Sequence, residues 1–181
     1  LLSSTGLVAR TSMLSNSDGS DQVSGSRAAH DVIVAACPTT TRSTIGAVTS
    51  LGRVVPLEVV DLPGIPPVSG TPALAAGVPI GAFTELRPEE QILELTPLDD
   101  TTTLALGTRS GVVKRVHTGP GSGRAKPQTV IALTDSDVVV GARALPEALA
   151  EASHLAFVTA AGNLLYFPAA SVRVQGVGAG G

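Results

Sequence analysis

The amino-acid sequence predicts an all-β repeat protein whose units are blades of antiparallel strands stacked side by side. Four short segments share one pattern, in which a strand ends in a small or hydroxylated residue and a glycine supplies the turn into the next strand. The turn glycines follow one another at intervals of 46, 59 and 51 residues. A period of about 50 residues is typical of stacked blades or solenoid units. The four glycines are Gly6, Gly52, Gly111 and Gly162.

The composition agrees with this fold class. Aromatic residues make up only 2% of the chain and Trp is absent, so Val, Leu, Ile and Ala must form the core, which suits sheets of small β-branched side chains. Glycine suits the turns because positive φ costs it nothing and short hairpins require positive φ. A chain of 181 residues can form one domain with a sizeable core, and we expect a single repeat domain over 1–181.

Strands are expected on either side of each turn. The first ten residues read as a strand, a turn and a strand, with no earlier strand to complete a blade, so the chain is expected to begin in mid-blade. Position 1 is not Met, which predicts a fragment or a processed piece. Val32–Ala36 is a continuous apolar run, consistent with a strand buried on both faces. Further strands are expected at 44–49, 53–60, 92–95, 102–107, 112–116, 130–133, 154–158 and 163–167.

Three segments are expected to be loops: 11–31, 61–90 and 117–128. Within the second, 63–81 carries five prolines, which excludes a helix and an inner strand, so we expect a connector over the surface. The third is basic and rich in glycine, but it has neither the strand and helix context of a dinucleotide-binding motif nor a Gly-Lys-Ser/Thr sequence. Residues 146–153 contain good helix formers and predict one short helix.

The charges are unevenly distributed along the chain. The net charge is −3 and the pI is about 5.5, which is a poor overall signature for a nucleic-acid-binding protein. From Glu85 to Asp100 there are six acids and one base, whereas 101–134 holds five bases and no acid. Taken alone, the two segments are interpreted as solvated faces of opposite charge. Combined with the repeat, the basic segment is interpreted as a nucleic-acid surface.

The repeat also resembles a known family. A strand, a Thr-x-x-Gly turn and a strand ending in Lys-Arg, as in 108–116, is similar to a blade of the C-terminal domain of the DNA gyrase A protein or of its topoisomerase IV equivalent. Phe167–Gly176 is similar to the segment that passes from such a hairpin to the next blade. The resemblance implies a β-pinwheel, a propeller-like array of blades with about four antiparallel strands each, here three blades and a partial fourth. Neighbouring blades of this family exchange strands.

The resemblance implies a non-catalytic DNA-binding and DNA-wrapping domain of a type IIA topoisomerase A subunit, which holds a bent duplex for strand passage. The implied partners are double-stranded DNA, the remainder of the A subunit, plus the ATPase B subunit, in the bacterial cytoplasm at the nucleoid. The holoenzyme is an ATP-dependent isomerase that uses ATP and magnesium, whereas this fragment is expected to hold no cofactor and no active site. Basic residues at the blade rims are the candidate phosphate contacts: Arg10, Arg53, Arg109, Lys114, Arg115, Arg124, Lys126 and Arg173.

One departure concerns the basic glycine-rich box that DNA wrapping by gyrase requires. Gln175–Gly181 keeps the Gln and several glycines but has no basic residue. A topoisomerase IV-like domain is therefore at least as well supported as a gyrase domain. The alternative function is a propeller-like protein-interaction module that does not bind DNA, which the acidic pI favours.

For the remaining residues that could form a site, a structural role explains the sequence better than a functional one. Cys37 is interpreted as a packed cysteine at a strand end, and Tyr166 as a packing residue of a hairpin rather than a nucleophile. Asp135 and Asp137 favour a hydrogen-bonded turn over a calcium loop, which would need further ligands. The three histidines lie too far apart to suggest a metal site. The longest nearly apolar run, of 11 residues, is too short to cross a bilayer, so no membrane partner is expected.

Overall fold

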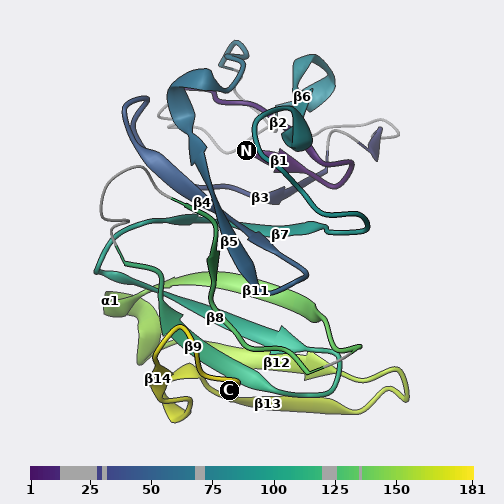
Figure 1. The fold of residues 1–181 in the computed structure, drawn as a ribbon, viewed down its shortest axis with the longest axis vertical. Coiled ribbons are helices and arrows are strands. Elements are labelled where there is room, and N and C mark those ends of the chain that lie inside the picture. The colour runs from purple at the N-terminus through teal and green to yellow at the C-terminus, as the bar shows by residue number, and fades with distance from the viewer. Residues whose placement is uncertain (13–27, 30–31, 68–71, 120–125, 135) are drawn as a thin grey trace, which may run out of the picture.

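The computed structural model describes residues 1–12, 28–29, 32–67, 72–119, 126–134 and 136–181. Over these residues the chain is all-β, as expected, with three four-stranded sheets and one two-stranded hairpin. The units follow one another down the long axis of the molecule, from the first sheet at the top of Figure 1 to the hairpin at the bottom.

Each unit is built on one of the four predicted hairpins. Their strands are β1 (Leu2–Ser3) with β2 (Leu7–Val8), β4 (Thr44–Thr49) with β5 (Arg53–Glu58), β8 (Thr102–Thr108) with β9 (Val113–His117), and β12 (His154–Val158) with β13 (Leu164–Pro168). Two more strands complete each of the first three sheets. The first strand of the hairpin pairs with β3 (Ile33–Ala35), β7 (Ile92–Pro97) or β11 (Val139–Pro146), and the second with β6 (Val78–Pro79), β10 (Gln128–Thr129) or β14 (Val174–Gln175).

The last strand of each sheet comes from beyond the next hairpin in the sequence. β6 follows β5 but pairs with β2, β10 follows β9 but pairs with β5, and β14 follows β13 but pairs with β9. The expected exchange of strands between neighbouring blades is thereby confirmed. β6 and β10 are antiparallel to their partners, whereas β14 runs parallel to β9.

Four expectations from the sequence need correction. Residues 130–133 do not form a strand, because the residues that pair with β5 are Gln128–Thr129, just before them and at the end of the expected loop 117–128. The first blade is not incomplete, because β3 and β6 from later in the chain give it four strands. The run at 32–36 is not buried on both faces, because β3 lies at a sheet edge and Val32 and Val34 are nearly half exposed. The proline-rich connector contributes the edge strand β6 together with the 3-10 turns η3 (Leu74–Ala76) and η4 (Ile80–Ala82). Its Pro79 is tolerated because an edge position needs no backbone donor.

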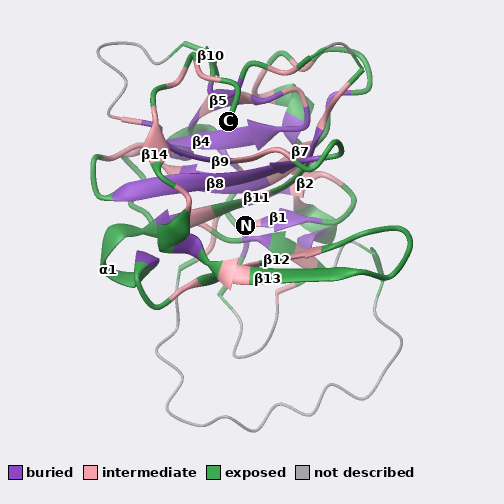
Figure 2. Cartoon of the chain, turned by 90° about the horizontal axis from the view of Figure 1, so that it is seen from below, coloured by how far each residue is buried: buried purple, intermediate pink, exposed green. Residues whose placement is uncertain are grey.

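Short helical turns connect the strands elsewhere. The expected helix is present as α1 (Glu147–Ala150), and matching 3-10 turns follow β5 and β13: η2 (Val59–Asp61) and η5 (Ala169–Ser171). The core lies between the sheets and is mainly aliphatic. One cluster, which includes Leu2, Leu57 and Leu95, joins the first and second sheets, and another, which includes Val54 and Leu104, joins the second and third. In Figure 2 the central strands are buried, whereas the β12–β13 hairpin is largely exposed.

The four hairpin turns repeat one hydrogen-bond pattern. The glycine N–H donates to the carbonyl of the Ser or Thr three positions earlier, and the next N–H donates to the hydroxyl of that same residue. All four glycines have positive φ, between 70° and 90°. The predicted turn positions are confirmed, and the hydroxyl explains why a Ser or Thr recurs three residues before each glycine. The hydroxyl residues are Ser3, Thr49, Thr108 and Thr159.

Substitution of Gly111 by Val tests the turn. A Cβ at Gly111 meets no atom within 4 Å, so any loss comes from its φ of 90° rather than from crowding. We expect the free energy of unfolding in urea to fall by more than about 1 kcal/mol, because a β-branched residue resists positive φ. Gly141→Val is the matched control, since Gly141 is equally uncrowded and lies in β11 without positive φ. Equal stability of the two variants would contradict the assignment.

Candidate nucleic-acid interface

Lys114 was expected to face solvent on the second strand of its hairpin, and this expectation is wrong. β9 lies inside the stack, and the Lys114 side chain is completely buried. Its Nζ donates to the carbonyls of Val130 (2.7 Å), Val177 (3.1 Å) and Ala179 (2.7 Å). Burial lowers the pKa of the ammonium group. Lys114 therefore joins β9 to the segment after β10 and to the C-terminal glycine-rich segment, and it cannot reach a phosphate.

Arg115 is also buried, so the same expectation is wrong for its neighbour. The two side chains point to opposite faces of β9 because alternate residues of a strand do so. Nη1 of Arg115 donates to the carbonyls of Ala169 (3.2 Å) and Val172 (3.3 Å), and Nη2 lies 3.4 Å from the hydroxyl of Thr103. Arg115 thus holds the third sheet against the turn η5 that leaves the fourth hairpin.

Arg10 occupies the position in the first hairpin that Arg115 occupies in the third. Each is the fourth residue after its turn glycine. Arg10 donates to the carbonyl of Leu62 (2.9 Å), the residue that follows η2, and Arg115 donates to the carbonyl of Val172, the residue that follows η5. Each arginine also forms a parallel β-bridge with the residue two positions after that carbonyl, Arg10 with Gly64 and Arg115 with Val174. We call Arg10 and Arg115 the inter-blade arginines. Both serve the fold.

Arg53 is held by a carboxylate. Its Nε lies 2.9 Å from Oε1 of Glu90 and its Nη2 lies 2.5 Å from Oε2, with the Glu90 side chain fully buried. Burial alone would raise the pKa of Glu90. The hydrogen bonds from Arg53, Thr49 and the backbone of Arg87 outweigh burial and lower the pKa of Glu90 to about 2. The pair is therefore ionised at neutral pH, and Arg53 is engaged within the second unit.

Three of the eight candidate residues remain exposed: Arg109, Lys126 and Arg173. In the part of the chain that the structure describes, none of the three forms an ion pair. Arg109 lies in the hairpin turn beside Ser110, whose N–H donates to Asp137 (3.1 Å), so one acid lies close to this turn. Arg124 falls outside the described residues. Two further exposed cations, Arg42 and Arg87, form no ion pair among the described residues. They were missed because they lie outside the repeat hairpins, the basic segment 101–134 and the segment 167–176, from which the candidates came.

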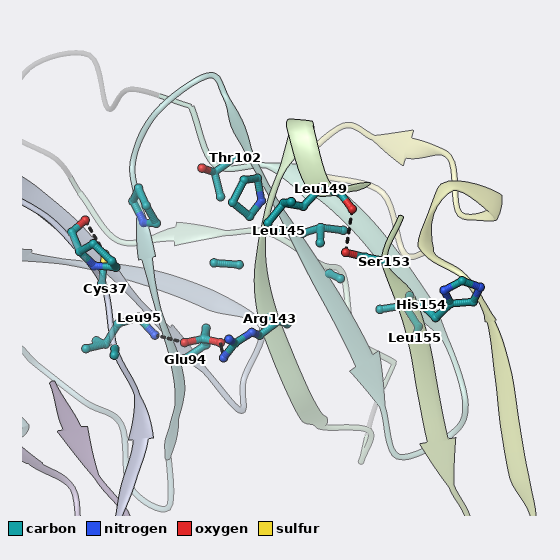
Figure 3. A pocket seen from close by; sticks show the side chains of 16 residues that line it. Cys37, Glu94, Leu95, Thr102, Arg143, Leu145, Leu149, Ser153, His154 and Leu155 are labelled. Carbon is teal, nitrogen blue, oxygen red and sulfur yellow. Dashed lines mark hydrogen bonds and ion pairs between the residues drawn. The ribbon is translucent and has the colours of Figure 1, made fainter. Parts of the chain in front are cut away.

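A cleft of about 520 Å³ lies between the second and third sheets and the fourth hairpin. Figure 3 shows Glu94 and Arg143 meeting at its wall, from β7 and β11. The buried Glu94 carboxylate accepts hydrogen bonds from the Leu95 N–H (3.0 Å) and from Nη1 of Arg143 (3.2 Å). Burial raises the pKa of Glu94 despite these donors. The sequence indicated Glu94 only as a polar interruption of a strand, but it links two sheets.

Other side chains of interest take structural places. Burial raises the pKa of Cys37 at the cleft to about 11, so the thiol stays protonated at neutral pH, as a packed cysteine should. Tyr166 was expected to pack in the core or in a contact between blades. It is 63% exposed, so it is not a core residue, and it stacks on His154 of the same hairpin with ring centroids 4.7 Å apart. Asp137 forms the expected hydrogen-bonded turn, whereas Asp135 lies outside the described residues.

Within the described ranges, no group of three or more His, Cys, Asp or Glu side chains is placed to hold a metal ion. A search of the same ranges for a helix long and apolar enough to span a membrane finds none.

Comparisons with solved structures agree with the resemblance noted in the sequence. The chain is similar to the C-terminal domain of DNA topoisomerase IV (26% identity, TM-score 0.62), covering 78% of this chain and 42% of that one. It is similar in fold to the DNA gyrase A C-terminal domain (20% identity, TM-score 0.52, 79% and 43% covered) and to the E. coli ParC C-terminal domain (19% identity, TM-score 0.61, 98% and 67% covered). The chain thus spans less than half the length of the first two. No family model and no curated protein sequence matches the chain.

Replacement of an inter-blade arginine should destabilise the fold. Arg115→Ala removes a charged donor from the carbonyls of Ala169 and Val172 and from the Thr103 hydroxyl, although the Ala169 carbonyl keeps the Val172 N–H. We expect the free energy of unfolding to fall by about 2–3 kcal/mol. Arg173→Ala is the control. It removes the same side chain from an exposed site and should stay within about 0.5 kcal/mol of the parent protein. A small loss at Arg115, similar to that at Arg173, would show that the hydrogen bonds contribute little.

The Arg53–Glu90 pair should give a defined pH dependence. The pKa of Glu90 falls from about 4.5 in the unfolded chain to about 2 in the folded one, so the folded state binds the proton less tightly. Its stabilising contribution is therefore present above pH 4.5 and is lost as the pH falls toward 2. We expect Glu90→Gln to be less stable than the parent at pH 7, with the difference shrinking at pH 3. A pH-independent difference in urea unfolding would contradict the assigned pKa.

Proposed function

We propose that this chain, which has the fold of the topoisomerase IV and gyrase A C-terminal domains, is a non-catalytic DNA-binding domain of the A subunit of a type IIA DNA topoisomerase. The supporting observation is the combination of this pinwheel fold with exposed, unpaired cations on its surface. The proposed partners are double-stranded DNA, the remainder of the A subunit, plus the ATPase B subunit. In this proposal the protein works in the bacterial cytoplasm, and ATP and magnesium act elsewhere in the holoenzyme.

The proposed DNA contacts are fewer than the sequence suggested. Arg109, Lys126 and Arg173 remain as the candidate phosphate contacts, and Arg124 remains a proposal without a described position. Side-chain contacts to phosphates are independent of sequence and are weakened by salt. With three contacts on a chain of net charge −3, the affinity for DNA should be weak, in the micromolar range at low salt.

The C-terminal glycine-rich segment favours the topoisomerase IV-like form of the proposal. Gln175–Gly181 has no basic residue. Lys114 binds its carbonyls at Val177 and Ala179, and Ala179 also accepts the Ala132 N–H (3.2 Å). A segment held this way against the third sheet has no charge to offer DNA. We therefore propose that the domain holds a duplex without the tight wrapping that a basic box would support.

Binding of a duplex of about 30 base pairs, followed by fluorescence anisotropy between 25 and 200 mM salt, tests the proposal. About three phosphate contacts predict a slope of log K against log salt of roughly −2.7. Arg109→Ala with Lys126→Ala should weaken binding about tenfold or more at low salt and flatten the slope by nearly two.

Arg42→Ala with Arg87→Ala is the matched control, because it changes the net charge equally outside the basic segment. The affinity of this control for DNA should fall less than that of the variant with Arg109→Ala and Lys126→Ala. Equal losses would mean that net charge alone attracts the DNA. No binding at low salt by the folded parent protein would favour the protein-interaction alternative, which the negative net charge supports.

A further inference from the structure

One buried ammonium group binds two segments of the chain at once. Nζ of Lys114 donates to the carbonyl of Val130, which directly follows β10, and to the carbonyls of Val177 and Ala179, which follow β14. An ammonium group has three N–H donors, so these three carbonyls satisfy all of them. The side chain is completely buried, and among the described residues no carboxylate pairs with it. The three carbonyls therefore stabilise the buried charge, and the charge in turn holds the two segments.

Each of the two segments carries an exposed cation four residues before the first carbonyl that Lys114 binds in it. These cations are Lys126 and Arg173, and both are candidate phosphate contacts. Neither 118–134 nor 167–181 contains Asp or Glu, so no acid of the same segment opposes either cation. Lys114 thus joins two acid-free segments, which come from distant parts of the sequence and each bring one exposed positive charge.

The regular structure that holds these two segments is short. β10 and β14 are each two residues long. One hydrogen bond joins the segments directly, from the N–H of Ala132 to the carbonyl of Ala179 (3.2 Å), which Lys114 also binds. The C-terminal end of the chain accordingly lies close to β10 in Figure 2. Four of the six residues in 176–181 are glycines, which lose much conformational freedom on ordering, so the placement of this segment depends strongly on Lys114.

We propose that Lys114 is a positioning residue for DNA binding, which holds Lys126 and Arg173 at a fixed spacing for one duplex without touching the duplex itself. This role rests on the proposed function. Cations that are held in place before binding lose less conformational entropy when they meet phosphates. Loss of Lys114 should therefore weaken DNA binding at every salt concentration, while the number of phosphate contacts, and with it the slope of log K against log salt, stays the same.

Lys114→Met tests the positioning role, because Met keeps an unbranched side chain but has no N–H donor. In the anisotropy measurement with a duplex of about 30 base pairs, its affinity should fall about threefold to tenfold at low salt, with the slope of the parent protein. Arg10→Met is the matched control. It also removes one cation that binds a backbone carbonyl, that of Leu62 in another part of the fold, and should bind DNA within about twofold of the parent. Equal losses in the two variants, or parent-like binding by Lys114→Met, would overturn the proposal.

Amide hydrogen exchange, read by mass spectrometry, measures the positioning itself. In Lys114→Met, exchange should become about tenfold faster or more in both 126–133 and 174–181, because the hydrogen bond between the two segments opens more often. Exchange in the hairpin 44–58 should not change, and Arg10→Met should leave both segments as they are in the parent protein. Faster exchange in only one of the two segments, or in neither, would show that Lys114 does not hold them together.

Variants of the two exposed cations test the proposal even if Lys114→Met fails to fold. Lys126→Ala and Arg173→Ala should each flatten the slope by about 0.9, and the double variant should flatten it by about twice as much. If Lys126→Ala weakens binding and Arg173→Ala does not, the two cations do not meet one duplex, and the positioning role is wrong while the proposed function stands. No DNA binding at low salt by the folded parent protein would instead contradict the proposed function, and the positioning role with it.

Discussion

The fold depends on cations that bind backbone carbonyls of neighbouring units and that form no ion pair with a carboxylate among the described residues. Lys114 and Arg115 lie on opposite faces of β9, and the carbonyls that they bind are 16 to 65 residues away in the sequence. Burying an unpaired charge costs several kcal/mol, so such a cation persists only where several acceptors converge on it. Through these two side chains, β9 holds the segment after β10 and the C-terminal segment on one face and the turn η5 on the other. Arg10 repeats the device in the first unit, whereas the second and fourth hairpins carry Pro56 and Tyr166 at the same position.

The turns could be predicted from the sequence because their cause is local. Each needs a glycine with positive φ and a hydroxyl three residues earlier, and both requirements are visible in four-residue segments such as 108–111. The strand exchange could be expected only through the resemblance to a known family. β6, β10 and β14 are two residues long and lie within proline-rich, glycine-rich or polar sequence, so no periodicity marks them. Their places are decided by pairing with strands that lie far away in the chain.

The candidate site was harder to predict for the same reason. A Lys-Arg pair after a turn has the appearance of an exposed strand end, and nothing near it in the sequence indicates the carbonyls that Lys114 and Arg115 bind. Likewise, Arg53 lies 37 residues from Glu90, and Glu94 lies 49 residues from Arg143. Burial therefore divides the basic residues into two groups. One group, which includes Lys114 and Arg115, binds backbone carbonyls of neighbouring units. The other, which includes Arg109 and Lys126, is exposed to solvent, where a phosphate could contact it.

The two lysines of the chain allow this division to be measured directly, because one belongs to each group. Acetylation of the native protein, read by mass spectrometry with and without duplex DNA, should modify the exposed Lys126 rapidly and leave Lys114 unmodified. DNA at low salt should then protect Lys126, while unfolding in urea should make both lysines reactive. Rapid modification of Lys114 in the native protein, or a rate at Lys126 that DNA does not change, would contradict this division.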